Sequence, residues 1–555
     1  MPLKFIEKSK GYPLDLRPPQ LDKIAFEFSK KWFGEGVCER VCEKMHRACP
    51  SVECIRADVD DYNRQYVQRV QNDTYLAVLE SVRKDFVPEK PLVPWTLGRC
   101  QKQGIPKDKS PGLPWRERGY KTKREVLEDP AACNEIHKYW SLVGKGYRTS
   151  SPDTMVYFRS QICGVEANKI RATWGYPMAY TLEEGRFVYP YLEWIRHTKK
   201  DVPVAYGVEM ATGGMAYIDN AYQDCKLADP TVKTALLDWR KFDKCVPAWL
   251  IRDAFEIMLQ CFTLNKVLCN DDHEWKVDPA KTRLRWKKVV NYFINTPFIL
   301  PSGERYQKEG GVPSGSTWTN IIDTIINAIV VRYCMFHVTG SMPMFDVYMG
   351  DDSCVFISRG IDLTEFSKVA HTEFGFILNE KKSYVTGERT NITFLGYHNY
   401  YGKPVRDGDF LLASFIYPER FHGTPDPAFT AMRAVGQMWS SLNGVLACKW
   451  LDLIEDMQTH FGFDVNWFAD HVKQHPGALK YLRLTGFDPT LLHVPQRKGW
   501  IVTEVEPPPV PRRAPSRRRY DMLVLYQSYF EHYLTEDQVW SSFRDERVKA
   551  LPVDL

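Results

Sequence analysis

The sequence has none of the segments that mark a chain for export or for a membrane. Lys, Glu and Pro interrupt its first fourteen residues, so no signal peptide is predicted. Its most apolar long stretch, residues 320–338, contains Asp323, Asn327 and Arg332, which a lipid-facing helix would hardly tolerate. We therefore expect no membrane span. The 555 residues, 44% hydrophobic and 26% charged, predict a large globular protein of three or four subdomains.

The chain also lacks the cysteine patterns of disulfide scaffolds and of paired-loop zinc sites. Its 14 cysteines are scattered, which predicts buried or free thiols in a reducing compartment. Cys38, Cys42, His46 and Cys49 form one cluster, and the first three could share a helix face. Four ligands from one helix cannot easily surround a tetrahedral ion, so we do not predict a zinc site.

Net charge is small, at +5, but the basic residues are unevenly placed. Residues 98–124 hold many Lys and Arg with Trp115 and Tyr120 among them, as on a basic, loop-rich surface. This segment suits a groove that follows a phosphate backbone, and an ordinary solvated loop fits it as well. Residues 504–519, rich in Pro and Arg, predict an extended linker, whose arginines either bind RNA or an acidic protein surface or are simply solvated.

Two pairs of aspartates carry the strongest chemical signal. In VYMGDDSCVF, residues 347–356, a glycine and two aspartates interrupt apolar residues that alternate as in two strands, which predicts a hairpin turn. Asp238 ends a second strand-like run, ALLDW at residues 235–239, and Asp243 follows where a helix is starting. A longer helix is predicted from Pro247, since Pro suits a first helical turn.

If these strands are neighbours, Asp238 lies next to Asp351 and Asp352. Three ionised carboxylates that close repel one another unless divalent cations lie among them. Oxygen-only ligation beside a phosphate substrate favours two Mg²⁺ ions, for which Mn²⁺ can substitute. Two such ions about 3.5 to 4 Å apart support an in-line phosphoryl displacement. The pattern therefore predicts nucleotidyl transfer.

The Gly-rich segment GGVPSGSTWTNIIDTIIN, residues 310–327, runs into a long helical pattern. It resembles a phosphate-binding NTPase loop in glycine spacing, but Ser316 occupies the place of the required lysine, which argues against that class. Thr319, Asp323 and Asn327 recur every four residues and form a polar ridge on an apolar helix. A buried polar ridge needs partners, and a ribose with its hydroxyls would supply them.

Together these segments resemble the palm motifs of viral RNA-dependent RNA polymerases. DWRKFD, GGVPSGSTWT and YMGDD are similar to motifs A, B and C, and further similarities fall in the family's order. These are SPGLPW at 110–115 (the template-binding motif), KIR at 169–171 (the basic finger motif), FGFILNEKKS at 374–383 (motif D) and TFLGY at 393–397 (motif E). Within the family the chain looks most like polymerases of partitiviruses, with picobirnaviruses as the nearest competitor; both are double-stranded RNA viruses.

The resemblance implies a role for each matching residue. Asp238 and Asp351 would bind metal, with Asp352 beside them, and Asp243 would read the ribose. The other implied nucleotide contacts are Lys169, Arg171, Ser314, Gly315, Thr319, Asp323 and Asn327, with Asp323 at a position where many relatives have asparagine. Lys382 would be the general acid that protonates pyrophosphate, although Lys381 is adjacent and stays an alternative. Ser110, Pro111 and Gly112 would contact the template.

The resemblance also implies the architecture: an α+β right-hand polymerase with fingers, palm and thumb, an enclosed active site and a palm built on an RRM-like antiparallel sheet. The implied division is 1–90 (a bridge from fingers to thumb), 91–230 and 262–310 (fingers), 231–261 and 311–410 (palm), 411–503 (thumb), 504–519 (linker) and 520–555 (helical tail). Such an enzyme would transcribe and replicate a double-stranded RNA genome from ribonucleoside triphosphates, as a monomer inside the virion in the host cytoplasm. It would contact capsid protein and start without a primer.

Two other functions stay open at this stage. A reverse transcriptase also uses a Tyr-Met turn before two aspartates, but here Gly350 intervenes, and Asp243 stands where those enzymes have a bulky residue against the 2′-hydroxyl. A non-catalytic RNA-binding protein of the capsid interior would need only the basic segments 98–124 and 504–519. A preference for deoxynucleotides would indicate the reverse transcriptase, and activity that survives Asp351→Asn would indicate the non-catalytic protein.

Overall fold

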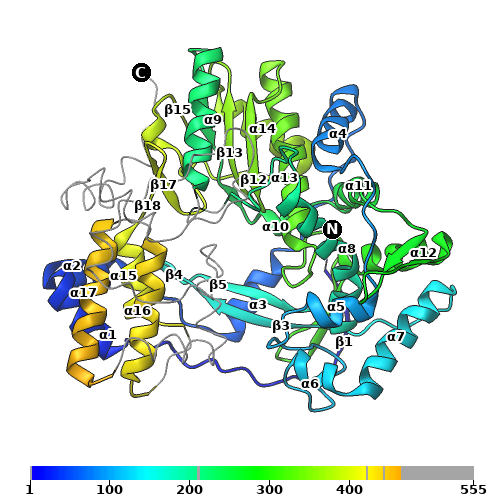
Figure 1. The fold of residues 1–555 in the computed structure, drawn as a ribbon, viewed down its shortest axis with the longest axis horizontal. Coiled ribbons are helices and arrows are strands. Elements are labelled where there is room, and N and C mark those ends of the chain that lie inside the picture. Colours follow the sequence, from blue (N-terminus) through cyan, green and yellow to red (C-terminus); the bar gives the residue numbers. More distant parts are fainter. Residues whose placement is uncertain (1–2, 209, 211–212, 420–422, 442–443, 464–555) are drawn as a thin grey trace.

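A computed structural model describes residues 3–208, 210, 213–419, 423–441 and 444–463. Figure 1 shows three groups of elements: a four-stranded sheet with its helices at the top, a five-stranded sheet with helices below and to the right, and a helical group at the left. The linker and the tail expected at 504–519 and 520–555, and the last part of the expected thumb, lie outside the described residues.

The four-stranded sheet has the strand order β12-β13-β6-β15, with every pair antiparallel. Its strands are β6 (Lys233–Leu236), β12 (Phe345–Met349), β13 (Asp352–Ile357) and β15 (Tyr384–Thr386). Helices α11 (Ala248–Leu259) and α13 (Thr319–Thr339) follow β6, and α14 (Leu363–Phe374) follows β13. This chain order with this strand order is the RRM-like arrangement, so the predicted palm sheet is confirmed.

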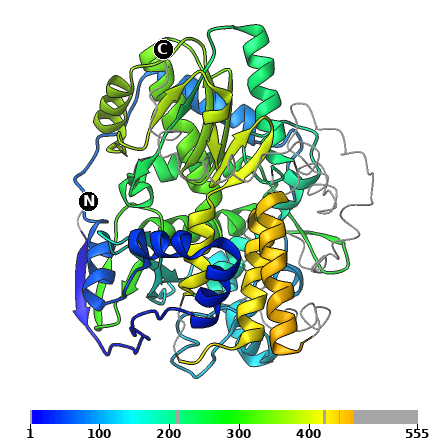
Figure 2. The same ribbon diagram turned by 90° about the vertical axis from the view of Figure 1, so that its left-hand side faces the viewer.

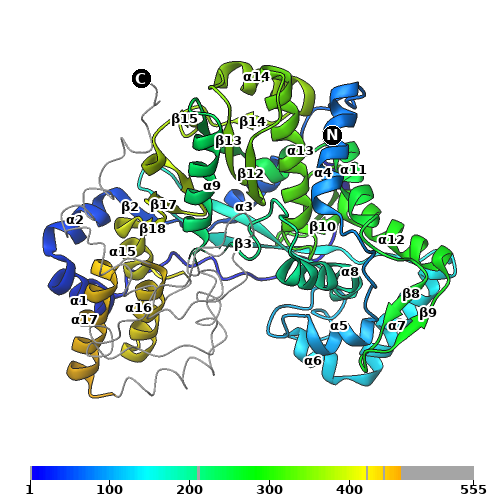
Figure 3. The ribbon, with the colours of Figure 1, turned by 45° about the horizontal axis from the view of Figure 1, so that its top comes forward.

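Alternating side chains make both faces of the palm sheet apolar. Val347 and Phe356 pack with Ile218 of α9 (Gly214–Ala228), whereas Tyr348 and Val355 pack with the residues of α13. Because side chains alternate along a strand, one strand can serve two cores. Helix α13 lies between the sheet, α4 (Asp73–Phe86) and α11 (Figure 3). It is the one described helix long and apolar enough to span a bilayer, yet 83% of its most apolar window is buried in the protein.

The predicted strand at 235–239 is wrong in its extent. β6 ends at Leu236, and Trp239–Arg240 form a separate short strand, β7, that pairs with β14 (Ile377–Leu378). Asp238 lies between the two strands, where its backbone N–H donates to the hydroxyl of Ser383, the residue before β15 (2.9 Å). The short helix α10 (Phe242–Cys245) follows, and the helix predicted from Pro247 is confirmed as α11.

The five-stranded sheet has the order β1-β11-β10-β3-β5, in which only β10 and β3 are parallel. Its strands are β1 (Lys4–Lys8), β3 (Thr154–Ser160), β5 (Ile170–Gly175), β10 (Pro297–Ile299) and β11 (Glu304–Gln307). The accompanying elements are α5 (Leu97–Gln103), α6 (Lys123–Glu128), α7 (Pro130–Gly144), α8 (Met178–His197), α12 (Pro279–Ile294) and the hairpin β8 (Lys266–Leu268) with β9 (Glu274–Lys276).

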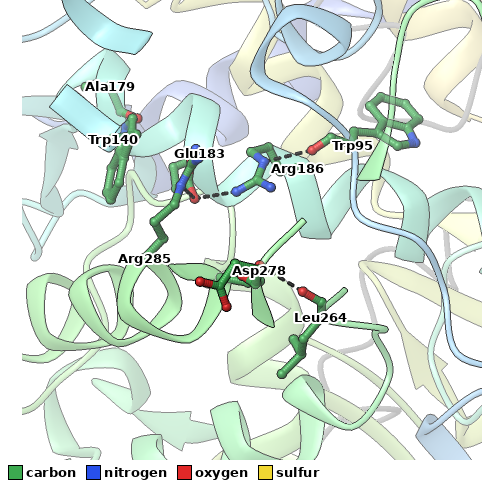
Figure 4. A network of polar contacts seen from close by, with 9 residues as sticks. Trp95, Trp140, Ala179, Glu183, Arg186, Leu264, Asp278 and Arg285 are labelled. Atoms are coloured by element: carbon green, nitrogen blue, oxygen red, sulfur yellow. Dashed lines mark hydrogen bonds and ion pairs between the residues drawn. The ribbon is translucent and has the colours of Figure 1, made fainter. Parts of the chain in front are cut away.

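A buried charge network joins α7, α8 and α12. Glu183 is fully buried and accepts hydrogen bonds from Arg186 (2.6 Å) on its own helix and from Arg285 of α12 (2.5 and 2.8 Å) (Figure 4). Trp140 of α7 donates its indole N–H to Ala179 O (2.8 Å) beside this network. Removing one partner of such a buried ion pair costs about 3–5 kcal/mol, so these three helices form a firm unit.

The N-terminal part of the chain contacts both of the other groups. β1 pairs with β11 in the five-stranded sheet, and α3 (Val52–Asp60) packs on β5. Helices α1 (Lys23–Phe33) and α2 (Glu35–Lys44) pack on α15 (Gly408–Ile416), and α1 also contacts α16 (Pro427–Ser441) and α17 (Gly444–Phe461) (Figure 2). Two small sheets complete the fold. The first pairs β2 (Met45–Arg47) with β4 (Ile162–Gly164). The second follows the short helix η2 (Arg389–Asn391) and consists of β16 (Thr393–Phe394), β17 (Tyr397–Tyr400) and β18 (Lys403–Arg406).

Two local predictions are corrected. His46 lies on β2 rather than on the helix that carries Cys38 and Cys42, and its Nε2 lies 2.6 Å from Ala167 O. In the basic segment 98–124, Trp115 is only 2% exposed and belongs to the main apolar core. Lys123 is buried as well, so only part of this segment forms a basic surface.

Candidate active site

The turn that carries Asp351 and Asp352 connects β12 to β13, as predicted, and α13 holds it in place. Gly350 has φ +62° and donates its N–H to the Thr324 hydroxyl (2.9 Å). Asn327 donates to Gly350 O (3.0 Å) and Asp352 O (3.3 Å). Positive φ is the region in which glycine is the least strained residue. The glycine therefore shapes the turn, and two side chains of one helix fix it.

These contacts correct the role predicted for Asn327. Its side chain is fully buried, and its Oδ1 accepts a hydrogen bond from the Trp239 indole (3.0 Å) while its Nδ2 serves the turn. Both ends of the Asn327 amide therefore have hydrogen-bond partners within the protein, without a ribose. We assign Asn327 to the architecture of the turn and leave it out of the nucleotide contacts.

Asp351 and Asp352 reach solvent on one side and are enclosed by protein on the others. This enclosure raises the pKa of both carboxyls, to about 7 for Asp352. The charge of Asp351 raises the pKa of Asp352 further, and the charge of Asp238 does so for both, whereas the charge of Arg171 lowers both. The cluster thus has the mutual repulsion expected of carboxylates that share a small space.

Asp238 is held from both sides by one segment of the chain. Asn379 donates its side-chain amide to Asp238 Oδ2 (2.9 Å) and its backbone N–H to Asp238 O (2.7 Å). Ser383 accepts the backbone N–H of Asp238 (2.9 Å). The turn between these two residues carries Lys381 and Lys382, both exposed. The candidate general acids therefore belong to the same short segment that orients Asp238.

Asp243 and Asp323 are close enough to Asp351 for charge to act between these carboxyls. Its Oδ2 accepts from Ser314 (3.3 Å) and Tyr62 (3.4 Å) and lies 3.6 Å from Lys244 Nζ. Asp323 of α13 is buried, and its Oδ1 has no hydrogen-bond partner within the described part of the chain. Burial, with the charges of Asp243 and Asp351 adding to it, raises the pKa of Asp323 well above the ordinary range. A protonated Asp323 can donate a hydrogen bond, as an asparagine would.

The loop before α13 is packed tightly against the five-stranded sheet. A Cβ on Gly315 would lie 1.8 Å from Trp174 O, so no larger residue fits without a backbone shift. Thr319 donates its hydroxyl to Pro313 O (2.6 Å), which closes the loop. Ser316 donates to the buried Glu184, and Thr317 N donates to the same carboxyl (3.2 Å). Burial raises the pKa of Glu184 to about 8.

The predicted finger and template residues lie at the ends of β5. Lys169 and Arg171 are exposed at its start, and the charge of Arg171 acts on Asp351 and Asp352. Pro111 O accepts the N–H of Met178, the first residue of α8 (2.9 Å). Gly112 has φ +67°, and a Cβ there would lie 2.7 Å from Tyr176 O. Ser110 Oγ lies 3.4 Å from the Tyr157 hydroxyl.

Several residues of this site escaped the sequence reasoning. Asn379, Ser383, Glu184 and Tyr62 are common polar residue types in segments with no distinctive spacing. Their signal is a partner far along the chain, such as the 141 residues between Asp238 and Asn379. No local pattern records a contact at that distance.

The donor set fits divalent cations by its chemistry, although the side chains are not gathered into a finished site. Among the residues that the structure describes, no three His, Cys, Asp or Glu side chains converge as a metal-binding group. Each of two further carboxylates has one oxygen bound by a neutral side chain, Asp238 by Asn379 and Asp243 by Ser314. Burial and the charges of neighbouring aspartates raise the pKa of Asp351 and Asp352, and a hard cation with oxygen ligands would relieve this repulsion.

The RRM-like palm sheet, the pinned Asp-Asp turn and the Gly-rich loop ahead of α13 define a class, and comparison with known proteins identifies it. Residues 56–404 match the family described as viral RNA-dependent RNA polymerase, and the chain belongs to that family. The predicted family and right-hand α+β fold are thereby confirmed.

The relatives come from double-stranded RNA viruses. The RNA-directed RNA polymerase of White clover cryptic virus 1 is 26% identical over 53% of this chain and 49% of its own length. The polymerase of Atkinsonella hypoxylon virus is 28% identical over 52% of this chain and 48% of its own length. The polymerase of Cryptosporidium parvum virus 1 is 24% identical over 60% of this chain and 63% of its own length. The chain thus matches about half the length of the first two relatives.

The fold has a solved counterpart. The Sicinivirus 3Dpol RNA-dependent RNA polymerase superposes with a TM-score of 0.61 over 84% of this chain and 96% of its own, at 14% identity. At this identity the likeness concerns the fold alone. The arrangement of sheets and helices is therefore that of a viral polymerase.

Proposed function

We propose that this chain is an RNA-directed RNA polymerase that transcribes and replicates a double-stranded RNA genome by two-metal-ion nucleotidyl transfer. The observation that carries the proposal is the Asp351–Asp352 turn, pinned by α13, whose pKa values are raised in part by the charge of Asp238 on the neighbouring segment. Membership in the viral polymerase family supports it. Mg²⁺, or Mn²⁺ in its place, is the proposed cofactor.

Each residue has a proposed task. Asp238 and Asp351 hold the cations, with Asp352 beside them; when bound, the cations activate the attacking 3′-hydroxyl and stabilise the leaving oxygen. Lys169 and Arg171 neutralise the triphosphate. Asp243, with Ser314, Gly315, Thr319 and Asp323 of the loop and helix beside it, orients the ribose. Lys382, or its neighbour Lys381, protonates the pyrophosphate, and Ser110, Pro111 and Gly112 guide the template.

The division into domains is part of the same proposal, with residues 1–90 as the bridge between fingers and thumb. Pairing of β1 with β11 and packing of α1 on α15–α17 support the bridge. The return of residues 262–310 to the fingers is supported by β10 and β11, which join the sheet of β3 and β5. A monomer that works in the virion interior, within the host cytoplasm and against capsid protein, is the proposed setting.

Incorporation of labelled UTP or GTP on a single-stranded RNA template tests the proposal. Wild type should form full-length product with Mg²⁺ or Mn²⁺, and Asp351→Asn should abolish it. Asp224→Asn, the same chemical change on the exposed face of α9, is the matched control and should keep wild-type activity. Absence of product from wild type with both ions would overturn the proposal, and a preference for deoxynucleotides would replace it with a reverse transcriptase.

A further inference from the structure

A cavity of about 540 Å³ lies in the fingers directly after the proposed template-binding residues. Pro114 and Trp115, which follow Ser110–Gly112 in the chain, form one wall. The loop 148–152 after α7 forms another, and Ala179 near the start of α8 closes a third side. The volume is in the range of sites that hold one small organic ligand, and it is too small for a duplex.

The cavity presents one charged group without a partner among the described residues. Arg148 is exposed, and its guanidinium forms no hydrogen bond or ion pair within residues 3–463 as far as these are described. An exposed guanidinium in the wall of a cavity suits an anionic ligand, because hydrogen bonds from arginine to an anion are among the strongest in proteins.

Charge and aromatic surface occur together at this site. Arg118, a second arginine in the wall, is held by Glu135 (2.7 and 3.0 Å), so Arg148 is the cation left for an anion. Trp115 and Tyr139 line the cavity and supply its aromatic surface. A cation beside an aromatic ring is the combination that holds one nucleotide, the cation on its phosphate and the ring against its base.

The walls are rigid before any ligand arrives. Ser151 Oγ and the Tyr139 hydroxyl both lie within 2.8 Å of the Tyr180 hydroxyl. Lys288 of α12 donates to Thr149 O (3.0 Å), and Trp140 donates to Ala179 O beside the buried charge network of Figure 4. A preformed cavity loses less conformational entropy on binding than a flexible loop would.

We propose that this cavity is a nucleotide-binding site outside the catalytic centre, with Arg148 on the phosphate and the aromatic and apolar wall against the base. Its ligand class rests on the proposed function. The nucleotide has two possible sources, a unit of the RNA strand near the template-binding residues or a free mononucleotide. Both carry the same phosphate and base.

The test uses the full chain in EDTA, so that binding is measured without synthesis. A fluorescein-labelled oligouridylate of ten nucleotides is titrated by anisotropy at several salt concentrations, and UMP and GMP are titrated by calorimetry. Arg148→Ala should weaken RNA binding about tenfold, which is the effect of a lost hydrogen bond to a charged group, and lower the slope of log K against log salt by about one. Arg283→Ala, which removes an exposed arginine of α12 outside the cavity, is the matched control and should change binding less than twofold.

Ser150→Phe provides a second variant that fills the cavity and leaves every charge in place. It should weaken binding while the salt slope stays that of wild type. Loss of oligouridylate binding alone assigns the site to the RNA strand, and loss of UMP or GMP binding assigns it to a free nucleotide. If Arg148→Ala and Ser150→Phe bind every probe as tightly as the Arg283→Ala control, the cavity is no nucleotide site, whatever the incorporation assay shows. If the incorporation assay fails while these variants bind RNA more weakly than the control, the proposed catalysis is wrong and the nucleotide-binding site stands.

Discussion

At the scale of single residues, Asp238 depends on two side chains that come 141 and 145 residues later in the chain. Asn379 binds its carboxylate, and Ser383 binds its backbone N–H. A carboxylate that is to hold a cation must keep one orientation, and a hydrogen bond from a neutral amide fixes it without neutralising its charge. Asn379 is therefore a positioning residue for Asp238.

Asn379→Ala should lower the kcat of nucleotide incorporation about tenfold to a hundredfold, because a hydrogen bond to a charged group contributes about 1.5–3 kcal/mol. The Mg²⁺ concentration for half-maximal rate should rise as well, which a purely structural defect would not cause. Steady-state incorporation at several Mg²⁺ concentrations measures both quantities. Asn134→Ala, an exposed change on α7, should leave them unaltered. An unchanged metal requirement in Asn379→Ala would contradict the role.

The raised pKa of Asp352 leads to a prediction about pH. Burial and the charges of Asp351 and Asp238 raise this pKa to about 7. Unfolded, the same carboxyl titrates near 3.9. Between these two pKa values the Asp352 carboxyl is protonated in the folded protein and ionised in the unfolded chain. The free energy of unfolding in the absence of metal therefore falls as pH rises from about 4 to about 7. Asp352→Asn removes this loss. In EDTA its melting temperature should exceed that of wild type at pH 8, and the difference should vanish below pH 4.

Mg²⁺ should reverse that order at pH 8. Ligands that bind only the folded state raise its stability, so Mg²⁺ should raise the melting temperature of wild type and have much less effect on Asp352→Asn. Thermal scans with and without Mg²⁺ measure the difference. Equal responses of the two proteins to Mg²⁺ would mean that Asp352 takes no part in cation binding.

At the scale of elements, the loop before α13 is held by the backbone of β5 as well as by its own hydrogen bonds. Gly315→Ala would place a methyl group against Trp174 O and should cost about 1–3 kcal/mol or more, as overpacking does. Gly36→Ala in α2 is the control, because open space surrounds Gly36 and alanine favours the helix by about 0.5–1 kcal/mol. Urea unfolding should therefore show opposite changes in the two variants, and a neutral Gly315→Ala would contradict this packing.

Local patterns were sufficient for some elements and insufficient for others. The turn at Gly350 and the start of α11 at Pro247 were predicted because strand alternation, glycine and proline act within a few residues. The extent of the strand before Asp238 was wrong because β6 pairs with β15 only as far as Leu236, whereas Trp239 pairs with Leu378 of β14, a partner far along the chain. Likewise the side chain of Asn327 matched a ribose contact by spacing, yet Trp239 and Gly350 occupy it.

At the scale of the whole molecule, Asp22 ties the first helix to the last described ones. It caps α1 through Ala25 N (3.0 Å), and it accepts from Thr430 (2.6 Å) and Arg433 (2.5 Å) of α16. Asp22→Ala would remove the buried carboxylate that binds the partly buried guanidinium of Arg433 and should cost about 3–5 kcal/mol. Hydrogen exchange should then quicken in α1 and α16 together. Asp73→Ala, at the exposed start of α4, should leave both unchanged, and slow exchange in Asp22→Ala would contradict the tie.

The contact of α1 with α16 also sets an order of events during synthesis. Asp22 and Arg433 are 411 residues apart, so at about 5–20 residues per second the ribosome needs roughly 20–80 s between them. Until then α1 lacks α16 and α17, and its Phe33 lacks the ring of Trp450 on which it packs in the finished protein. In that interval the nascent chain can form its palm sheet, but α1 cannot yet pack on α16. Closure thus waits for at least the first 433 residues, and a ribosome that stops earlier leaves α1 without its partner helix.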